Sequence, residues 1–367
     1  MKKRIYICHT FYHVYIACLK ELELLAEQRG SAASKGTGQQ KATLMLSTMS
    51  NDFGTLQERA QKCGLFEDAV LFEEKEDIFF PEVMKYHTDR GNIIWNMCNR
   101  IKYTKLLGKL QEPYVPVDLT TYQDIYVFCD SDPIGYYLAW KKIPYHAVED
   151  GLNCICYYDT ARYDNRGHFG LKAWMAAHNL IFMQNGWSKY CLDMEVNDLS
   201  ILPYPCPKYI ERPRKELTNR LTQADKQLLL HLFVADIEEL TKQLETGSAH
   251  KVLILTEPLC SLEVRERLFR DLIEQYGKKE EDVQILIKPH PRDLLEYKKI
   301  FAEYIVLDGK FPMEMLNYIE GLRFDRVVSV YTVPAGIEFA GEIIFLGDDF
   351  MDLYEAPEIH RFNEQIS

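Results

Sequence analysis

A single histidine lies between two prolines, directly after an apolar run in the last third of the chain. Residues 283–288 (VQILIK) predict a buried strand. Pro289 and Pro291, on either side of His290, must end this strand because proline lacks a backbone N–H and fixes φ. Lys288 and Arg292 flank the histidine. Two cations balance the charge of a phosphate, and an imidazolium donates a hydrogen bond or a proton to it. This stretch is therefore a candidate phosphate site, with a solvated basic turn as the alternative.

Carboxylates follow two other short strand patterns. Glu149 and Asp150 precede Gly151, which permits a tight turn that exposes acidic side chains. Two adjacent carboxylates can supply a general base, because one raises the pKa of the other. An acidic turn without chemistry is the alternative. Glu257 is a third acid just beyond a predicted strand and a further candidate base.

Two later segments have residues suited to a nucleotide. Residues 309–314 (GKFPME) predict a helix start, where the Glu314 carboxylate is stabilised and could accept both hydroxyls of a ribose. An ordinary acid in a first helical turn is the alternative. Residues 329–336 (SVYTVPAG) predict a strand end, a turn and a helix start near Ala335. Free N–H groups there, with the hydroxyls of Tyr331 and Thr332, would form a phosphate cradle, and capping by Thr332 is the alternative.

The first half of the chain offers further candidates. His9 and His13 follow the first predicted strand and could line a cleft, although a position on a helix face explains His13 equally well. Asp130 and Asp132 have D-x-D spacing, but they precede Pro133 at a strand end, which favours a turn and a helix cap. No ligand cluster accompanies the phosphate site, so no metal and no other cofactor is predicted.

Composition places the chain among globular proteins with room for two domains. It has 367 residues, of which 47% are hydrophobic and 27% charged. A net charge of −12 argues against a general nucleic-acid binder. The ten cysteines show no CxxC pair, which favours reduced thiols over a disulfide framework. No window of about 18 apolar residues predicts a membrane span. The predicted location is the cytoplasm, with peripheral attachment to the inner face of the membrane as a further option.

Strand and helix patterns alternate along the chain and place these residues at strand ends. In the first half, strands are predicted over 4–8, 42–47, 69–72, 124–129 and 146–148, and helices over 11–27, 92–110 and 133–142. Residues 30–40 predict a loop. In the second half, strands are predicted over 251–256, 283–288, 304–307, 326–331 and 342–346, and helices over 261–276, 314–321 and 335–340.

The alternation predicts two successive α/β domains built on parallel sheets. The predicted domains are residues 1–210 and 251–367, joined by a helical connection over 211–250 whose buried face is 228–234. Ligands of such sheets bind beyond the carboxyl ends of the strands, where the candidate residues lie. No Walker loop or GxGxxG motif occurs, which argues against nucleoside triphosphates and dinucleotides.

Together the motifs resemble the bacterial sialyltransferases of glycosyltransferase family 52, with more distant similarity to family 80. They stand in the family's order along most of the chain: the Glu149-Asp150-Gly151 turn, His290-Pro291, Pro312-x-Glu314, and a hydroxyl pair before a helix. The family's serine pair is replaced here by Tyr331 and Thr332.

The resemblance implies a GT-B fold, with two Rossmann-like domains facing a cleft and CMP-sialic acid held mainly by the second. It implies inverting transfer without a metal, with His290 as general acid at the CMP phosphate, Glu314 at the ribose and the hydroxyl pair at the phosphate. One acid of Glu149 and Asp150 would be the base, as in the family 80 pattern. It also suggests a homodimer.

The expected activity is transfer of sialic acid from CMP-sialic acid to a terminal sugar, often galactose, of a bacterial surface glycan such as lipooligosaccharide or capsule. The partners are thus a nucleotide-sugar donor and a glycan acceptor. One alternative is a transferase with a different nucleotide-sugar donor. Another is a non-catalytic protein of the same fold that binds nucleotides or glycans.

Overall fold

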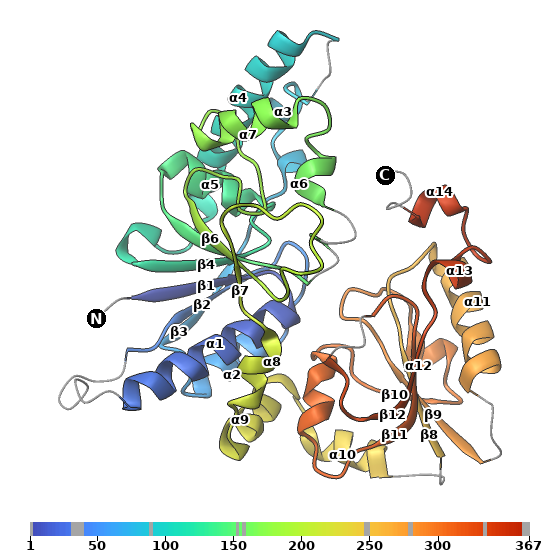
Figure 1. The fold of residues 1–367 in the computed structure, drawn as a ribbon. Coiled ribbons are helices and arrows are strands. Elements are labelled where there is room, and N and C mark those ends of the chain that lie inside the picture. The colour runs from blue at the N-terminus through green and yellow to red at the C-terminus, as the bar shows by residue number, and fades with distance from the viewer. Residues whose placement is uncertain are drawn as a thin grey trace. The chain divides into compact units, whose positions relative to one another are not determined.

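The computed structural model describes residues 3–30, 40–87, 91–151, 154–155, 159–245, 250–277, 282–332 and 336–361. The chain divides into two compact units, Met1–Thr222 and Gln223–Ser367, coloured blue to yellow-green and yellow to red in Figure 1. Residues 211–250, expected as a connection, contribute α8 (Arg214–Asn219) to the first unit. They also contribute α9 (Gln223–Phe233) and α10 (Ile237–Glu245) to the second. The expected loop over 30–40 lies almost entirely outside the described residues.

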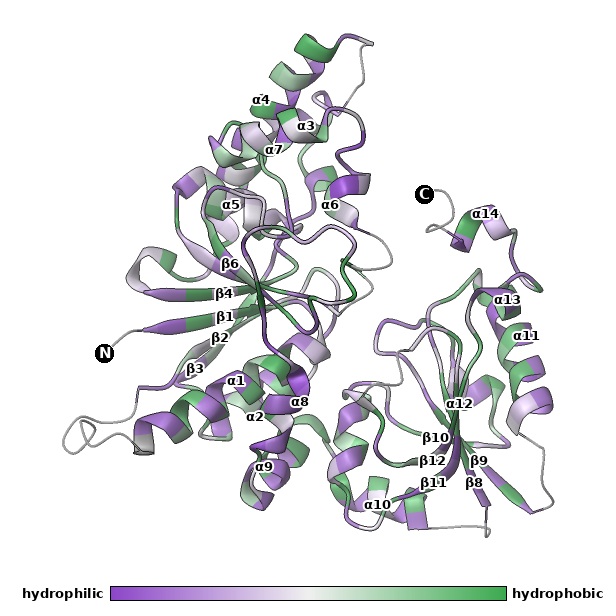
Figure 2. Cartoon of the chain, in the orientation of Figure 1, coloured by the Kyte–Doolittle hydropathy of each residue, from purple (hydrophilic) through white to green (hydrophobic). Residues whose placement is uncertain are grey.

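The first unit is built on a seven-stranded parallel sheet with the order β3-β2-β1-β4-β5-β6-β7. Its strands are β1 (Arg4–Cys8), β2 (Thr43–Ser47), β3 (Asp68–Phe72), β4 (Asp124–Phe128), β5 (Tyr145–Val148), β6 (Cys191–Val196) and β7 (Tyr209–Glu211). β1 and β4 begin with a charged residue and turn hydrophobic toward their carboxyl ends, which Figure 2 shows as purple changing to green. The chain order reverses direction between β1 and β4, and such a switch point is where α/β sheets bind ligands.

Helices cover this sheet and connect its strands. They are α1 (Phe11–Gly30), α2 (Leu56–Lys62), α3 (Pro81–Met84), α4 (Ile93–Gln111), α5 (Pro133–Lys141), α6 (Thr160–Tyr163), α7 (Phe169–Ala177) and α8, with short 3-10 turns at Asp77–Phe79, Glu112–Tyr114 and Leu119–Thr121. Gly135 lets α5 start directly against the β4 exit, because a Cβ there would lie 2.0 Å from the backbone oxygen of Asp130.

The second unit has a five-stranded parallel sheet with the order β10-β9-β8-β11-β12. The strands are β8 (His250–Leu255), β9 (Val283–Lys288), β10 (Ile305–Val306), β11 (Phe324–Ser329) and β12 (Ala340–Phe345). The helices are α9, α10, α11 (Leu262–Leu272), α12 (Tyr297–Ile300), α13 (Gly347–Met351) and α14 (Pro357–His360), with a π-helical turn at Ile273–Gly277 and a 3-10 helix, η7, at Met313–Tyr318. Here the switch point lies between β8 and β11.

The predicted fold class is confirmed, since both units are α/β and both sheets are parallel. Two predictions were incomplete or wrong. β6 and β7 were not foreseen, and within the described part of the helix expected over 335–340 only Gly336 is helical, in a 3-10 turn. Residues 337–339 are not helical and β12 starts at Ala340, while 333–335 lie outside the described residues. No helix within the described parts of the chain is both long and apolar enough to cross a membrane.

Candidate active site

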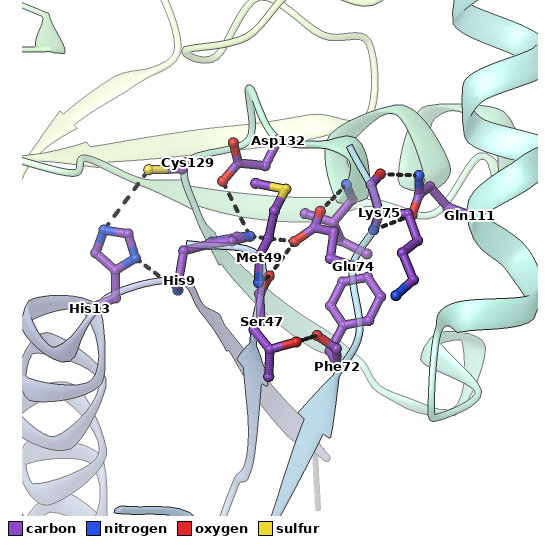
Figure 3. Close-up of polar contacts among 12 residues, drawn as sticks. His9, His13, Ser47, Met49, Phe72, Glu74, Lys75, Gln111, Cys129 and Asp132 are labelled. Atoms are coloured by element: carbon purple, nitrogen blue, oxygen red, sulfur yellow. Dashed lines mark hydrogen bonds and ion pairs between the residues drawn. The ribbon is translucent and has the colours of Figure 1, made fainter. Parts of the chain in front are cut away.

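A buried histidine cluster lies at the switch point of the first unit (Figure 3). His9, which follows β1, places its Nε2 atom 2.8 Å from Glu74 Oε2 and 3.3 Å from Asp132 Oδ2. The Ser47 hydroxyl donates to Glu74 over 2.6 Å, and the Ile134 backbone N–H donates to the same carboxylate over 2.7 Å. Residues at or just beyond the carboxyl ends of β1, β2, β3 and β4 thus converge on one ionic centre.

The charges of this cluster stabilise each other. Burial alone would lower the pKa of His9, but Glu74 and Asp132 outweigh it and raise that pKa to about 9, so the imidazolium is the neutral-pH form. Burial raises the pKa of Asp132 to about 7, against the attraction of His9 and with a contribution from Glu74. Asp132 is therefore a carboxylate that can gain or lose a proton near neutral pH.

Asp132 differs from its expected role as a helix cap. It occupies the N-cap position of α5, yet its side chain makes no capping hydrogen bond and turns toward His9 instead. Asp130 is fully buried and accepts hydrogen bonds from the Tyr145 hydroxyl and the Asn185 backbone N–H. The D-x-D spacing thus places one acid in the core and one in the histidine cluster, because residues two apart in this turn face different elements.

The two adjacent acids after β5 have different surroundings. Glu149 is buried and accepts the Asn197 backbone N–H over 2.9 Å, and burial raises its pKa. Asp150 keeps 35% of its side chain exposed, and Oδ1 makes a short hydrogen bond with His13 Nε2. Of the two candidate bases, Asp150 is the one whose carboxylate reaches the surface of the first unit.

Three side chains at this edge could hold a metal by position alone. Among the described residues the one such group is His13, Cys129 and Asp150, with ligand atoms within 4.8 Å of one another. However, the His9 backbone N–H donates to His13 Nδ1 over 3.1 Å, which requires the neutral imidazole to carry its proton on Nε2. Nε2 then has no lone pair for a metal, and burial raises the pKa of the Cys129 thiol.

In the second unit, His290 is fixed beyond the end of β9 as expected. Its backbone N–H donates to Thr256 Oγ1 over 3.1 Å, and its Nδ1 accepts the Arg292 backbone N–H over 3.2 Å. The proton of the neutral ring therefore lies on Nε2, on the far side of the ring from this loop. Burial, Arg292 and Lys288 lower the pKa of His290 to about 4. In the absence of an anion, the ring is a neutral hydrogen-bond donor at neutral pH.

Hydrogen bonds and an ion pair of Asp293 stabilise the turn that carries His290. The Asp293 carboxylate forms a 2.5 Å ion pair with Arg265 and accepts a 2.7 Å hydrogen bond from the Tyr297 hydroxyl. The backbone N–H of Asp293 donates to the His290 carbonyl over 3.0 Å. Pro291 is half-buried within the same turn, and Arg292 is exposed. The exposed guanidinium is therefore the cation beside His290 that a phosphate could meet.

Lys288 is placed differently from its expected role. Its side chain is buried, and Nζ donates to the carbonyl oxygens of Pro289 and Gly309 over 3.3 and 3.0 Å and lies 4.1 Å from the Phe311 ring centre. Burial lowers the pKa of Lys288 to about 7. In this arrangement it joins two edge loops, and its contact with a phosphate stays a prediction.

Glu314 lies in the first turn of η7, half-buried beside Gly336. A Cβ at Gly336 would lie 3.6 Å from Glu314 Oε1, an ordinary van der Waals contact, so the carboxylate packs directly beside this residue. Burial raises the pKa of Glu314 to about 7, and Lys288 partly counteracts this. A carboxylate that changes protonation near neutral pH can accept hydroxyl protons, and its contact with a ribose stays a prediction.

Glu257 meets the hydroxyl pair across the switch point of the second unit. Its carboxylate accepts the Tyr331 backbone N–H at 3.0 and 3.1 Å and the Thr332 hydroxyl through a short bond. Burial raises the pKa of Glu257. The Tyr331 hydroxyl donates to Asp348 over 2.6 Å. Glu257 thus fixes the conformation of the loop after β11. The hydroxyl protons of Tyr331 and Thr332 are both donated to carboxylates of the protein. A role of Glu257 as base, and contacts of these two hydroxyls with a phosphate, stay predictions.

The structure gathers the expected residues into two sets. His9, His13 and Asp150 lie at the carboxyl edge of the first sheet, and Glu257, Lys288, His290, Glu314, Tyr331 and Thr332 lie at the corresponding edge of the second. Sequence reasoning missed Ser47 and Glu74 and misassigned Asp132. Ser47 ends β2 and Glu74 follows β3 by two residues, so the position after a strand was the available signal.

Comparison with known proteins agrees with this architecture. An α/β-galactoside α-2,3-sialyltransferase of Photobacterium phosphoreum has a TM-score of 0.50 at 13% identity, covering 94% of this chain and 90% of that one. A 2,6-sialyltransferase of Photobacterium sp. JT-ISH-224, solved with CMP and lactose, has a TM-score of 0.54 at 10% identity, covering 94% and 71%. At these identities the likeness shows the fold, which is of the GT-B type with two Rossmann-like units.

Sequence comparison assigns the family. An uncharacterised protein of Haemophilus influenzae is 29% identical over 126 residues, which are 33% of this chain and only 38% of that relative. A model of glycosyltransferase family 52 matches residues 99–335, which take in β4 of the first unit and the His290 turn of the second. Because this match covers more than half of the sequence, the chain belongs to glycosyltransferase family 52.

Proposed function

We propose that the chain is a glycosyltransferase that moves sialic acid from CMP-sialic acid to a terminal sugar, galactose in the first instance, of a bacterial surface glycan. The observation that carries the proposal is the fixed His290 ring, with an Nε2–H donor and the exposed Arg292 beside it, at the ligand-binding edge of a family 52 chain. A phosphate leaving group needs this combination of a donor and a cation.

The ligands of a protein with the same fold support this choice of substrates. The Photobacterium 2,6-sialyltransferase was solved with CMP as donor product and lactose as acceptor substrate. We assign this chain a donor and an acceptor of the same chemical classes. The homodimer and a peripheral site of action at the cytoplasmic membrane belong to the same proposal.

The proposed reaction needs a proton transfer at the acceptor oxygen and a hydrogen bond, without proton transfer, at the departing phosphate oxygen. Asp150 takes the proton of the acceptor hydroxyl, whose oxygen forms the new bond to the anomeric carbon of sialic acid. The bond from that carbon to the phosphate oxygen breaks, and its electron pair leaves with CMP. His290 donates to the departing phosphate and Arg292 offsets its charge, so negative charge is stabilised where it develops.

The donor is tested by thermal shift with CMP, UDP, GDP and ADP at equal concentrations. We expect CMP alone to stabilise the protein, because a ligand at 100 times its dissociation constant adds about 2.7 kcal/mol to the free energy of unfolding. Stabilisation by another nucleotide alone would assign a different nucleotide-sugar donor. CMP binding without transfer or hydrolysis of CMP-sialic acid would instead indicate a non-catalytic binding protein.

We expect turnover to persist in excess EDTA. The group that could ligate a metal by position, around His13, carries its imidazole proton on the nitrogen that a metal would need. The charge of the leaving phosphate is instead met by His290 and Arg292, whose donors need no metal. The measurement is the transfer rate before and after EDTA, with manganese or magnesium added back. A loss of activity that either ion restores would contradict metal-independent transfer.

A further inference from the structure

We propose that His13 is a positioning residue that aims the carboxylate of Asp150 and never takes up the proton that Asp150 removes. This inference rests on the proposed function, in which Asp150 is the base. It concerns a residue that sequence reasoning assigned equally to a cleft wall and to a helix face.

The His13 ring is fixed by the helix turn that carries it and by the core around it. It lies in the first turn of α1, where its backbone N–H donates to Thr10 Oγ1 over 3.1 Å. The ring is fully buried and stacks on Phe128 of β4 at 4.8 Å between ring centres and 13° between planes. Such a ring has no other rotamer to adopt without opening the core, so the direction of its Nε2 atom is fixed.

A backbone group determines which nitrogen carries the proton. The His9 N–H donates to His13 Nδ1 over 3.1 Å, as Figure 3 shows, so Nδ1 must present its lone pair. The proton of the neutral ring therefore lies on Nε2 and is donated to Asp150 Oδ1. Protonating Nδ1 would set two N–H groups against each other inside the core, which disfavours the imidazolium.

The neighbouring titratable groups act on the His13 ring in opposite directions. Those that face it among the described residues are His9 from the end of β1, Cys129 from the end of β4 and Asp150 from the end of β5. His9 carries positive charge at neutral pH, with its ring centre 6.1 Å away, and a second cation beside it would be repelled. The carboxylate of Asp150 acts in the opposite direction, so the lone pair that Nδ1 presents to the His9 N–H is the observation that assigns the neutral ring.

Two consequences follow for the reaction. Because both ring nitrogens are committed, His13 cannot accept the proton from Asp150, and that proton stays on the carboxylate until the product has left. Because Nε2–H holds Oδ1, the carboxylate is oriented before the acceptor arrives. Orientation of this kind contributes to rate, since a misplacement of about 1 Å can cost about 100-fold.

A pair of amide substitutions separates the two ring functions. His13→Gln places an amide donor near the position of Nε2, whereas His13→Asn keeps an acceptor near Nδ1 and cannot reach Asp150. We expect His13→Asn to lower kcat by about 100-fold and His13→Gln to retain most of the turnover, with CMP affinity unchanged in both. Equal kcat values for the two variants would overturn the proposal, as would full activity of His13→Asn.

The chain offers a matched control in the same sheet. His146 of β5 also pairs with an aspartate, Asp193, at 2.8 Å, and stacks on Tyr126 at 5.0 Å. It lies within the strand, away from the carboxyl edge. The contact of His146 with Asp193 is made by Nδ1, so His146→Gln, whose amide lies near Nε2, is the variant that loses it. We expect His146→Gln to lower the melting temperature yet to leave kcat unchanged. Equal losses of kcat at both positions would show a purely structural effect.

A measurement without turnover keeps this inference separate from the proposed donor. In protein labelled with ¹⁵N-histidine, the His13 signals are those that disappear in His13→Gln. We expect them to report a proton on Nε2 and a lone pair on Nδ1. An imidazolium or a proton on Nδ1 would overturn the assignment whatever the substrate is. Wild-type protein that shows this tautomer but no turnover with CMP-sialic acid would contradict the proposed function and leave the positioning geometry intact.

Discussion

Replacing Asp150 by asparagine is expected to lower turnover with the proposed donor by about 10²–10⁴-fold, the usual contribution of a positioned acid or base. The substitution keeps the shape of the side chain and an oxygen that can accept the His13 Nε2–H, so the edge of the first sheet should stay folded. It removes the ability to take a proton. CMP should bind as before, because the residues proposed to hold it belong to the second unit. Turnover, CMP affinity and melting temperature of one preparation provide the measurement.

Two matched variants decide whether the effect belongs to Asp150. Glu149→Gln changes the adjacent acid, whose buried carboxylate accepts the Asn197 N–H, and an amide oxygen can accept that bond too. We expect nearly normal turnover. Asp132→Asn tests the other carboxylate near the surface, whose pKa burial raises to about 7. If Asp132→Asn abolished turnover while Asp150→Asn did not, the base would be Asp132.

The edge of each sheet where chemistry is possible could be predicted from the sequence. Parallel strands bring their carboxyl ends to one edge, so every polar residue directly after a predicted strand is a candidate for the same site. This placed Asp150, Glu257 and His290 correctly at their edges. It depends only on the alternation of strands and helices, which the apolar patterns indicate strongly.

The orientation of those side chains could not be predicted, because it depends on contacts from distant segments. Glu149 turns inward because its backbone N–H joins Glu195 of β6, a strand that the sequence pattern did not reveal. Lys288 appeared as a free cation, but its position inside a buried strand end directs the amine to the carbonyls of Pro289 and Gly309. A position along the chain does not show which neighbour a side chain will meet.

Tertiary contacts also explain the missing helix after β11. The side chain of Asn317 in η7 donates to the Gly336 carbonyl over 2.8 Å and accepts the Glu338 backbone N–H over 2.9 Å. These bonds occupy backbone groups that a helix would have to use, so this segment runs into β12 instead. Local propensity favoured a helix, and a residue about twenty positions away prevented it.

The second large effect is expected at His290. His290→Ala should lower turnover by about 10²–10⁴-fold, because it removes the Nε2–H donor at the leaving phosphate. CMP should still bind, since Glu314 and Arg292 remain. The fold should change little, because the one hydrogen bond of the half-buried ring to the described residues is the Arg292 N–H of its own turn. His290→Asn is the matched control, since an asparagine oxygen can accept the same N–H in an Asx turn while removing the donor. It should be as stable as the wild type and as inactive as His290→Ala.

The protonation of His290 determines whether CMP affinity rises or falls with pH. Without ligand the pKa of His290 is lowered to about 4, so the ring is neutral from pH 5 upward. A phosphate charge about 4 Å away is worth about 4 kcal/mol near a protein surface, which equals about three pKa units and would bring the bound pKa to about 7. The second proton goes to Nδ1, so its uptake also requires the Arg292 N–H to leave that nitrogen, which this half-buried turn permits more easily than the core around His13 does. Because the bound pKa is the higher one, CMP binding takes up a proton between these values and strengthens as pH falls from about 7 toward 4.

Calorimetry at pH 5.5 in two buffers of different ionisation enthalpy measures the uptake, and subtracting His290→Asn removes the titration of CMP itself. A wild type that takes up no more protons than His290→Asn, or an active His290→Asn, would mean that the phosphate does not lie against this ring.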